Sequence, residues 1–421
     1  MTPSHPDAPS NPIATTEQHE TERRALELFG HPRLVETREE IRDYWTKSLP
    51  RSDEMLACLD PAFEEVMFSA VVWSLNQDPL RPKVVTITRL PHRLGELRIP
   101  GSRWGLDNPD SVYRVIPIDG DERYVIRGQA PRHRMTENYF TLWDRDMATV
   151  DVLDGRRLEL GADGAFEITV DRDPANGRPN HVRSTPEAHE FYIRDVLMDW
   201  KRERINRLSI ERLGGAPGRP APSLEEELEL AARYMWKWAR ETDRWNAQPE
   251  GIPVNHFEFK IDRDTDGALR SQIYVLGHFR LASDDEALVL TVDLGGADYF
   301  VAPISNAWGT TLDIQNRTAS LNRAQSQPNA DGTITYVLSV RDPGVHNWLD
   351  PCGLHEGTLT LRWAEFAKDR PEGGPSVTSR VVPLAGLRDH LPAETAFVTP
   401  EMRRRQCEER AASYAWRLRE D

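Results

Sequence analysis

Few of the residues and motifs that mark familiar chemistry occur in this chain of 421 residues. Its three cysteines, Cys58, Cys352 and Cys407, lie far apart and form no CxxC or Cys/His zinc spacing, so we expect free thiols and no zinc site. The alternative is that Cys352 acts as a nucleophile near His355. The nucleophile elbow GxSxG, the phosphate loop GxxxxGK, the dinucleotide motif GxGxxG and the zinc motif HExxH are all missing. These absences exclude several enzyme classes, and no cofactor is predicted.

Long apolar runs and a positive net charge are also missing. No stretch of about 18 apolar residues exists, which excludes a transmembrane helix. The net charge of −15 argues against binding to nucleic acid or to an anionic membrane. Residues 1–20 are rich in Pro, Ser and Thr and lack a basic start or an apolar segment, so they predict a disordered tail and no signal peptide. We therefore expect a cytoplasmic protein that binds a small-molecule substrate or ligand, with homo-oligomer formation left open.

The hydrophobic patterns that are present predict an α+β protein that is mainly β. Apolar residues recur at helical spacing over 21–48 and 61–75. Short strands separated by Asp-Gly turns follow, and together these elements predict an N-terminal α+β region over residues 21–182. Within it, residues 112–118 and 123–127 flank a turn and predict a β-hairpin.

Two helices are expected between the β regions. The sequence Thr-Pro-Glu at 185–187 places an N-cap before a proline at the first helical position, and we expect this helix to reach Leu213. A Gly- and Pro-rich break at 214–222 follows. The spacing of Ser and Glu in 223–226 is that of a capping box and begins a second helix. The pair predicts a helical hairpin over 183–250.

The region 251–398 reads as a β-sandwich, because strands follow one another with loops and without helices. A Thr-Pro N-cap then predicts a C-terminal helix over 399–421. The expected strands of the sandwich are 257–261, 271–281, 287–294, 299–305, 333–340, 357–363 and 377–383.

Three segments of the expected sandwich carry unusual sequence, and they read ISNAWGTTLDIQNR at 304–317, ADGTITYVLSVRDPGVHNWLD at 330–350 and GTLTLRW at 357–363. Together they resemble the bacterial DUF1214 domain family. A fourth segment, DNPDSVYRVIPIDGDERYVIRG at 107–128, resembles the part that precedes this domain in the longer members of the family. The resemblance implies a jelly-roll-like β-sandwich, and it implies little about function because the family is uncharacterised.

The polar loop 342–356 is the first candidate site, because loops carried on a rigid sheet often hold binding and catalytic residues. His346 or His355 could act as a general base, with Asp342 or Glu356 orienting it. The motifs RDPG and NWLD match the family pattern, whereas His346 does not, which weakens His346 as a shared catalytic residue.

Three further residues of this part of the chain are expected to bind substrate. Arg341 could hold a carboxylate, phosphate or sulfate through its guanidinium. Trp348 could stack on a sugar or an apolar ring, and Asn347 lies beside it. The alternative is structural: the Asp-Pro-Gly sequence at 342–344 is turn chemistry, and Trp348 closes the end of the sandwich.

The segment 107–128 holds the second candidate site. Asp107 and Asp110 could form an acid–base pair or hold a cation through their carboxylate oxygens, with Tyr113 and Arg127 binding substrate. The alternative is an Asx-turn, since Asn-Pro-Asp is common turn chemistry. If this segment meets the loop of the first candidate site in space, a cleft between the two β regions becomes the default site.

A third polar set could form a binding network at strand ends, or it could be loop decoration. Trp308 and Arg317 of this set are expected to bind substrate. The chain holds 12 tryptophans, which suit sugar binding but more often fill a core. The whole set is Asn306, Trp308, Asp313, Asn316, Arg317 and Asn322.

Two classes of function fit these patterns. The first is a cytoplasmic enzyme that acts on a small organic substrate by hydrolytic or eliminative acid–base chemistry, in a cleft between the two β regions. The second is a non-catalytic protein that binds a carbohydrate or another small molecule. A scaffold in a multiprotein assembly is a third alternative, and it would show a large exposed apolar patch and no pocket.

Overall fold

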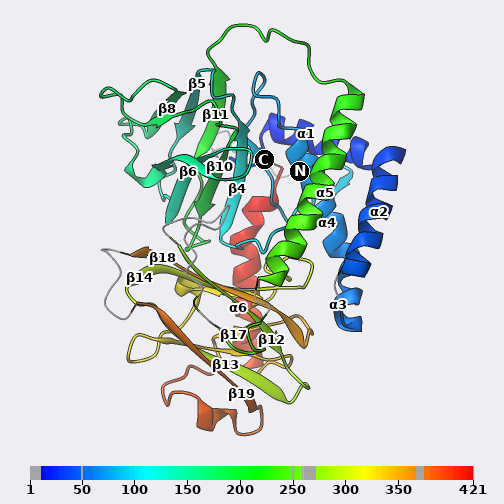
Figure 1. Ribbon diagram of the computed structural model, residues 1–421. Coiled ribbons are helices and arrows are strands. Elements are labelled where there is room, and N and C mark those ends of the chain that lie inside the picture. Colours follow the sequence, from blue (N-terminus) through cyan, green and yellow to red (C-terminus); the bar gives the residue numbers. More distant parts are fainter. Residues whose placement is uncertain are drawn as a thin grey trace.

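Two β regions lie one above the other, with helices beside the upper one (Figure 1). The computed structural model describes residues 11–48, 51–248, 251–257, 259, 272–366 and 374–420. The expected α+β, mainly β, class is confirmed by the order of helices and antiparallel sheets. None of the described helices is both long and apolar enough to cross a membrane.

The upper region holds a five-stranded sheet and a four-stranded sheet that pack face to face. Their shared core is aliphatic and aromatic, with Phe140, Phe191 and Ile193 from the first sheet against Ile126 and Ile168 from the second. The first sheet has the order β1 (Val85–Thr86), β4 (Ser111–Pro117), β10 (Glu190–Val196), β6 (Glu137–Trp143), β7 (Thr149–Asp154). The second has the order β11 (Arg207–Arg212), β5 (Tyr124–Gln129), β8 (Ala165–Asp171), β9 (His181–Arg183), and β2 (His92–Leu94) pairs with β3 (Leu97–Ile99).

Helices cover the other face of the first sheet. Side chains of that face, among them Tyr113, Trp143 and Tyr192, share one core with the helices. Helix α4 is buried along nearly its whole length, because it carries apolar residues on all of its sides. The helices are α1 (Thr16–Phe29), α2 (Pro32–Ser48), α3 (Asp53–Ala57), α4 (Leu59–Ser74) and α5 (Leu224–Ala247), the last with the expected capping box at Ser223.

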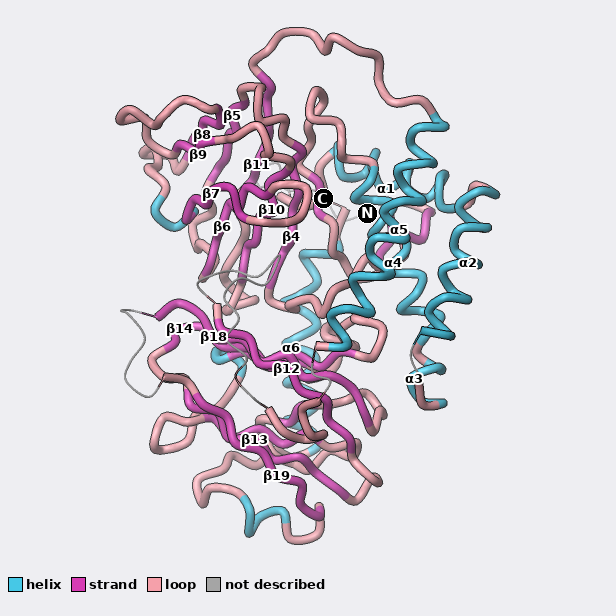
Figure 2. The backbone as a smooth tube through the Cα atoms, in the orientation of Figure 1, coloured by secondary structure: helices cyan, strands magenta, loops and turns pink. Residues whose placement is uncertain are grey.

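The lower region is the expected β-sandwich. Its inner faces meet in a core that includes Leu290, Phe300, Tyr336 and Trp363. One sheet has the order β12 (Ile273–Arg280), β18 (Glu356–Phe366), β14 (Ala297–Ser305), β15 (Ser320–Asn322), and the other has β17 (Trp348–Leu349), β16 (Ile334–Leu338), β13 (Glu286–Asp293), β19 (Ser376–Pro383). Strands β12, β14 and β18 form the layer nearer the upper region (Figure 2). The strand expected over 257–261 falls mostly outside the described residues.

The C-terminal helix is present as α6 (Pro400–Tyr414), and Thr399 caps it as expected. In Figure 1 it runs from beside the sandwich up into the N-terminal region. Its arginines are not all on the surface: Arg403 and Arg410 are both buried. The helix therefore ties the two β regions together through buried polar side chains.

The helix expected from 186 to Leu213 is wrong, because this stretch forms β10 and β11. Strand β10 is hydrogen-bonded between β4 and β6, and every one of its residues is buried. In a strand that is buried on both faces, apolar and polar residues need not alternate. Its hydrophobic pattern therefore does not distinguish it from a buried helix. The Thr-Pro-Glu sequence forms a turn, in which Ala188 N donates to Thr185 O at 2.9 Å.

Two other expectations also fail. The hairpin expected from 112–118 and 123–127 does not form, because β4 and β5 belong to different sheets and the chain crosses between them. The tail expected over 1–20 ends earlier, because α1 begins at Thr16 and buries Gln18 against β1, where Thr86 N donates to its side chain at 2.7 Å. Residues 1–10 lie outside the described part.

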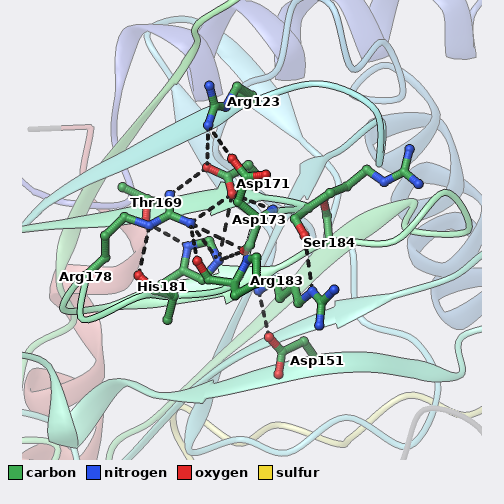
Figure 3. A network of polar contacts seen from close by, with 12 residues as sticks. Arg123, Asp151, Thr169, Asp171, Asp173, Arg178, His181, Arg183 and Ser184 are labelled. Carbon is green, nitrogen blue, oxygen red and sulfur yellow. Dashed lines mark hydrogen bonds and ion pairs between the residues drawn. The ribbon is translucent and has the colours of Figure 1, made fainter.

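A polar network secures the connection between β8 and β9 (Figure 3). Arg178 donates to both carboxylate oxygens of Asp171, at 2.7 and 3.0 Å. Thr169 Oγ1 and His181 Nδ1 lie 2.8 Å apart beneath this pair. The network joins the two ends of the loop between β8 and β9, which pair in parallel.

Candidate functional site

The outer face of the sandwich lies against the upper region. Alternation along β18 places Trp363 in the sandwich core and sends Thr358, Thr360 and Arg362 out of it. These outward residues are nevertheless buried, with exposures of 0%, 2% and 8%. The upper region therefore covers a polar face that a lone sandwich would expose to water.

The helix-facing side of the first upper sheet presents polar aromatic side chains. Strand register aligns Tyr113, Arg194 and Tyr139 in one row across β4, β10 and β6. Because side chains alternate along a strand, Tyr192 and Glu137 lie on the same face one step away. This face thus carries a guanidinium flanked by phenols.

Five residues of the two faces form what we call the interface cluster: Tyr113, Tyr192, Arg194, Tyr274 and Arg362. The guanidinium of Arg362 hydrogen-bonds with the phenol of Tyr113 and lies 5.4 Å from the ring centre of Tyr274. The guanidinium of Arg194 lies 4.4 Å from the ring centre of Tyr192. The positive charges of both guanidiniums act to lower the pKa of Tyr192, so both lie near its phenol. The two β regions therefore contribute to one cluster.

The charge on Arg362 has no carboxylate to balance it. Among the described residues no ion pair includes Arg362, and its Nε has no hydrogen-bond partner. Its Nη2 donates to the carbonyl of Leu106, which is neutral. Burial raises the pKa of Tyr192 well above its ordinary value of 10.0, so that phenol is neutral too. A buried cation without a counter-charge is costly, and a bound anion would remove the cost.

A carboxyl group lies at the edge of the interface cluster. Glu137 is 0% exposed, and its Oε2 accepts a hydrogen bond from Gln272 Nε2 at 2.6 Å. Burial, and then the neighbouring charge of Glu365, raise the pKa of Glu137 to about 8. Glu137 is therefore a neutral carboxylic acid at pH 7.

Two residues near the interface cluster have strained backbone. Leu106 and Glu365 have φ of 56° and 59°, which is left-handed backbone that non-glycine residues seldom adopt. Leu106 turns its carbonyl to Arg362, and Glu365 accepts a hydrogen bond from Tyr139 at 2.9 Å. Strain of this kind is typical of functional sites.

The segment 107–128 does meet the lower β region, as expected, but its carboxylates bind protein groups. Asp110 is 0% exposed and accepts from Trp200 Nε1 at 2.8 Å, Tyr299 Oη at 2.8 Å and Asn322 Nδ2 at 2.9 Å. Burial raises its pKa. These bonds join the upper region to β14 and β15, which gives Asp110 a structural role.

Asp107 is held in a similar way. Its Oδ2 accepts from Thr311 Oγ1 at 3.0 Å, and burial raises its pKa to about 6. The segment 107–128 therefore contacts β14, β15 and the turn at Thr311, and no contact joins its carboxylates to the loop 342–356. The expected meeting of the first and second candidate sites does not occur among the described residues.

Of the two residues expected to bind substrate in this segment, only Tyr113 lies in the interface cluster. Arg127 lies on β5, in the other sheet, where it is exposed. It is paired with Glu167 at 2.7 Å and with Glu211. Arg127 is thus separated from Tyr113 by the core of the upper region.

The loop 342–356 does not gather its polar residues into one site. Arg341 is exposed and pairs with Asp285. Asp342 accepts from Gly344 N at 2.8 Å and pairs with Arg403 at 3.0 Å. Trp348 is 7% exposed and donates to Ser339 O at 2.9 Å. These contacts match the structural alternative of a turn and a buried plug.

The two histidines of the loop are separated as well. His355 lies between Glu54 at 3.0 Å and Asp284 at 2.9 Å, and the hydrogen bond with Glu54 is the main reason why its pKa is raised. His355 therefore joins α3 to the sandwich and does not pair with Asp342. The distant His346 has its pKa lowered by burial.

His346 and Asn347 line a pocket of about 80 Å³ at the end of the sandwich. The amide of Asn347 donates to the carbonyls of Gln327 and Thr335, at 2.8 and 3.0 Å. His346 Nε2 lies 3.3 Å from Gln325 O. The pocket has room for only a few water-sized groups.

The third set divides between core and surface. Trp308 is 1% exposed, donates to Met55 O at 2.6 Å and stacks on Trp45 with ring centres 5.4 Å apart. Arg317 binds Asp350 with two hydrogen bonds of 2.6 and 2.7 Å. Asn306 and Asn322 are buried, whereas Asp313 and Asn316 are bonded to each other at the surface. Trp308 is therefore a core residue.

The residues of the interface cluster other than Tyr113 were not predicted from sequence. Arg194 lies in the stretch that was expected to be helical, and Arg362 lies on the strand face opposite the sandwich core. No group of three or more His, Cys, Asp or Glu that could hold a metal ion occurs within the described ranges.

Comparisons with known proteins identify the fold but no function. An uncharacterized protein from Burkholderia cenocepacia has a similar structure, with a TM-score of 0.71 and 24% identity over 86% of this chain and 100% of that one. The VPA0106 protein from Vibrio parahaemolyticus has a TM-score of 0.43 and 12% identity over 77% of this chain and 99% of that one. No family model and no curated protein matches the sequence. The first similarity shows a shared fold alone.

Proposed function

We propose that this protein binds a small organic anion in the interface cluster and acts on it as an enzyme by acid–base chemistry. The observation that supports the proposal is the buried Arg362, whose charge no described carboxylate balances. Guanidinium groups are suited to carboxylates, which they bind through paired N–H donors. A carboxylate between Arg362 and Arg194 would supply the missing counter-charge.

The rest of the interface cluster fits a small ligand with an apolar part. The rings of Tyr192 and Tyr274 lie beside the guanidiniums, with ring centres 4.4 Å from Arg194 and 5.4 Å from Arg362. Tyr113 offers a phenol that is already hydrogen-bonded with Arg362. Sites that bind small organic ligands commonly combine aromatic side chains with a few charged groups. Non-catalytic binding of the same anion is the alternative, and it predicts binding without turnover.

Thermal unfolding with added ligands tests the proposal. Acetate, propionate, succinate, phosphate, sulfate and glucose would be added to the wild type, to Arg362→Gln and to Arg341→Gln. Arg341→Gln is the matched control, because it removes one exposed arginine of the sandwich. A ligand at 100 times its Kd stabilises a protein by ~2.7 kcal/mol, which raises the midpoint of unfolding by several degrees.

We expect a carboxylate to stabilise the wild type and Arg341→Gln, and to have no effect on Arg362→Gln. If Arg341→Gln loses the response and Arg362→Gln keeps it, the site lies at the loop 342–356 and the proposal is wrong. Glucose as the active compound would favour the sugar-binding alternative. No response to any anion would also overturn the proposal.

We also propose that the sandwich is a jelly-roll-like domain of the DUF1214 family and that the protein acts in the cytoplasm. The family proposal rests on the four segments quoted above. The cytoplasmic proposal rests on three cysteines without a pairing pattern, all of which are free. Fractionation of cells that express the chain would test the second of these.

A further inference from the structure

Glu137 occupies a position from which it can reach a ligand of the interface cluster. It lies two residues before Tyr139 on β6, on the same face as Arg194 of the neighbouring strand β10. Arg194 pairs directly with Tyr139, so Glu137 is its diagonal neighbour, and diagonal residues lie roughly 7–8 Å apart. The positive charge of Arg194 acts to lower the pKa of the Glu137 carboxyl, so the two groups are near each other. One small molecule can therefore contact both side chains.

One oxygen of Glu137 is already bonded and the other is not. Oε2 accepts from Gln272 Nε2 at 2.6 Å, whereas Oε1 is buried and has no hydrogen-bond partner among the described residues. Because Oε2 serves as an acceptor, a proton on this carboxyl resides on Oε1, where it is a hydrogen-bond donor. A buried donor without an acceptor is destabilising, so the site is incomplete as it stands.

The surroundings of Glu137 keep that proton in place. Glu365 is the nearest like charge, and it is fixed by Arg156 and by Tyr139, which donates to it at 2.9 Å. Together with burial, this neighbour raises the pKa of Glu137 to about 8. A carboxyl group that titrates near neutral pH is suited to donating a proton or a hydrogen bond.

We infer that the ligand of the interface cluster is a hydroxy or oxo acid, whose carboxylate binds Arg362 and Arg194 and whose second oxygen accepts a hydrogen bond from Glu137 Oε1. This inference rests on the proposed function, since it presumes an anion at the guanidiniums. A plain carboxylate would balance Arg362 but would leave Oε1 unbonded. An oxygen beside the carboxylate satisfies both at once.

Calorimetric titration with three matched acids tests the inference. Propionate, lactate and pyruvate have the same carbon skeleton and differ only in the oxygen next to the carboxylate. We expect the wild type to bind lactate or pyruvate at least tenfold more tightly than propionate at pH 7. In Glu137→Met, which lacks a donor, we expect this preference to fall to about twofold or less.

The amide of Glu137→Gln retains a donor that does not titrate, so this variant separates hydrogen bonding from charge. We expect it to keep the preference at pH 7 and to bind equally well at pH 9. The wild type should lose at least tenfold in affinity between these pH values, because the ionised carboxylate repels the anion and cannot donate. Glu159→Gln changes an exposed glutamate and should behave as the wild type.

The outcomes distinguish a failure of the hydroxy- or oxo-acid inference from a failure of the proposed anion site. If propionate binds as tightly as lactate and pyruvate, and Glu137→Met changes nothing, the inference is wrong while the proposed anion site stands. If no acid binds the wild type, or Arg362→Gln binds each acid as well as the wild type does, the proposed function itself fails.

Discussion

At the scale of single residues, the burial of Arg362 has a cost in stability. It is buried at 8% exposure between two β regions and lacks an ion-pair partner in the described chain. Moving a cation out of water costs several kcal/mol unless a counter-charge balances it. The hydrogen bonds to Leu106 and Tyr113 offset this cost by roughly 1 kcal/mol each. Without a counter-charge, such a residue is expected to destabilise the folded protein.

Arg362→Met should therefore raise the stability of the protein without ligand. Methionine has a similar length and no charge, so the cost of burial disappears along with the two hydrogen bonds. We expect a gain of ~1–2 kcal/mol, measured by denaturant unfolding. Arg280→Met, at an exposed arginine on the same sheet, is the control and should change stability by less than ~0.5 kcal/mol. A loss of stability in Arg362→Met would show that the charge is balanced.

Glu137 should make stability depend on pH near neutrality. Its folded pKa of about 8 lies above the ordinary value of 4.5, so between these values the folded state holds a proton that the unfolded state has released. The stability from this proton is fully present below 4.5, falls as pH rises and is lost above about 8. The slope is at most ~1.4 kcal/mol per pH unit.

Comparison of unfolding free energies for the wild type and Glu137→Gln isolates this effect. The difference between them should change steadily from pH 5 to pH 8, whereas Glu159→Gln should follow the wild type at each pH. A constant difference across this range would mean that Glu137 is already ionised at pH 5 in the folded protein.

At the scale of elements, β9 depends on the polar network of Figure 3. Strand β9 has only three residues, His181–Arg183, and it pairs in parallel with β8. A pairing this short contributes few hydrogen bonds of its own. Asp171 adds two hydrogen bonds with Arg178, at 2.7 and 3.0 Å, next to this pairing.

Asp171→Asn should loosen this element. The hydrogen bond from Arg178 lowers the pKa of Asp171, so its stabilisation is present above the ordinary value of 3.8 and is lost as pH falls through the folded pKa. At pH 7 we expect a loss of ~1–2 kcal/mol and faster proteolysis within 172–180. Asp146→Asn, at an exposed position, should have neither effect. Unchanged proteolysis would show that β9 is held by its backbone alone.

At the scale of the whole molecule, Asp110 joins the two β regions. Its three donors come from Trp200 in the upper region and from Tyr299 and Asn322 in the sandwich. Tyr299 Oη also accepts from Asn108 Nδ2 at 2.8 Å. Hydrogen bonds to a buried carboxylate are strong, and each donor left without it is costly.

Asp110→Ala should weaken the connection between the β regions. We expect a loss of ~3–5 kcal/mol in unfolding free energy and faster hydrogen exchange of the β14 amides. Asp313→Ala removes a surface carboxylate and serves as the control. If Asp110→Ala unfolds at the wild-type denaturant concentration, the hydrogen bonds of Asp110 add no net stability to the connection between the two β regions.

Much of the fold could be predicted from local patterns. The sandwich strands were recognised because apolar residues alternate with polar ones, as in GTLTLRW, where the outward residues are polar although they are buried. Helix α5 was recognised from the capping box at Ser223. Strands β6 and β10 were not recognised, because both faces are buried and no alternation remains. The pairing of β5 with β8 and β11 depends on a crossing between sheets that no turn residue signals.

The sequence by itself determined the class of fold, most strands of the sandwich and the helices at both ends. Only the tertiary structure brought Arg194 and Arg362 together, although 168 positions separate them. The reason is physical: the alternation of β18 assigns Arg362 to the face away from the sandwich core, but whether that face meets water or protein depends on what packs against it. The upper region covers it, and that burial makes an ordinary arginine on a strand into a charge that requires a partner.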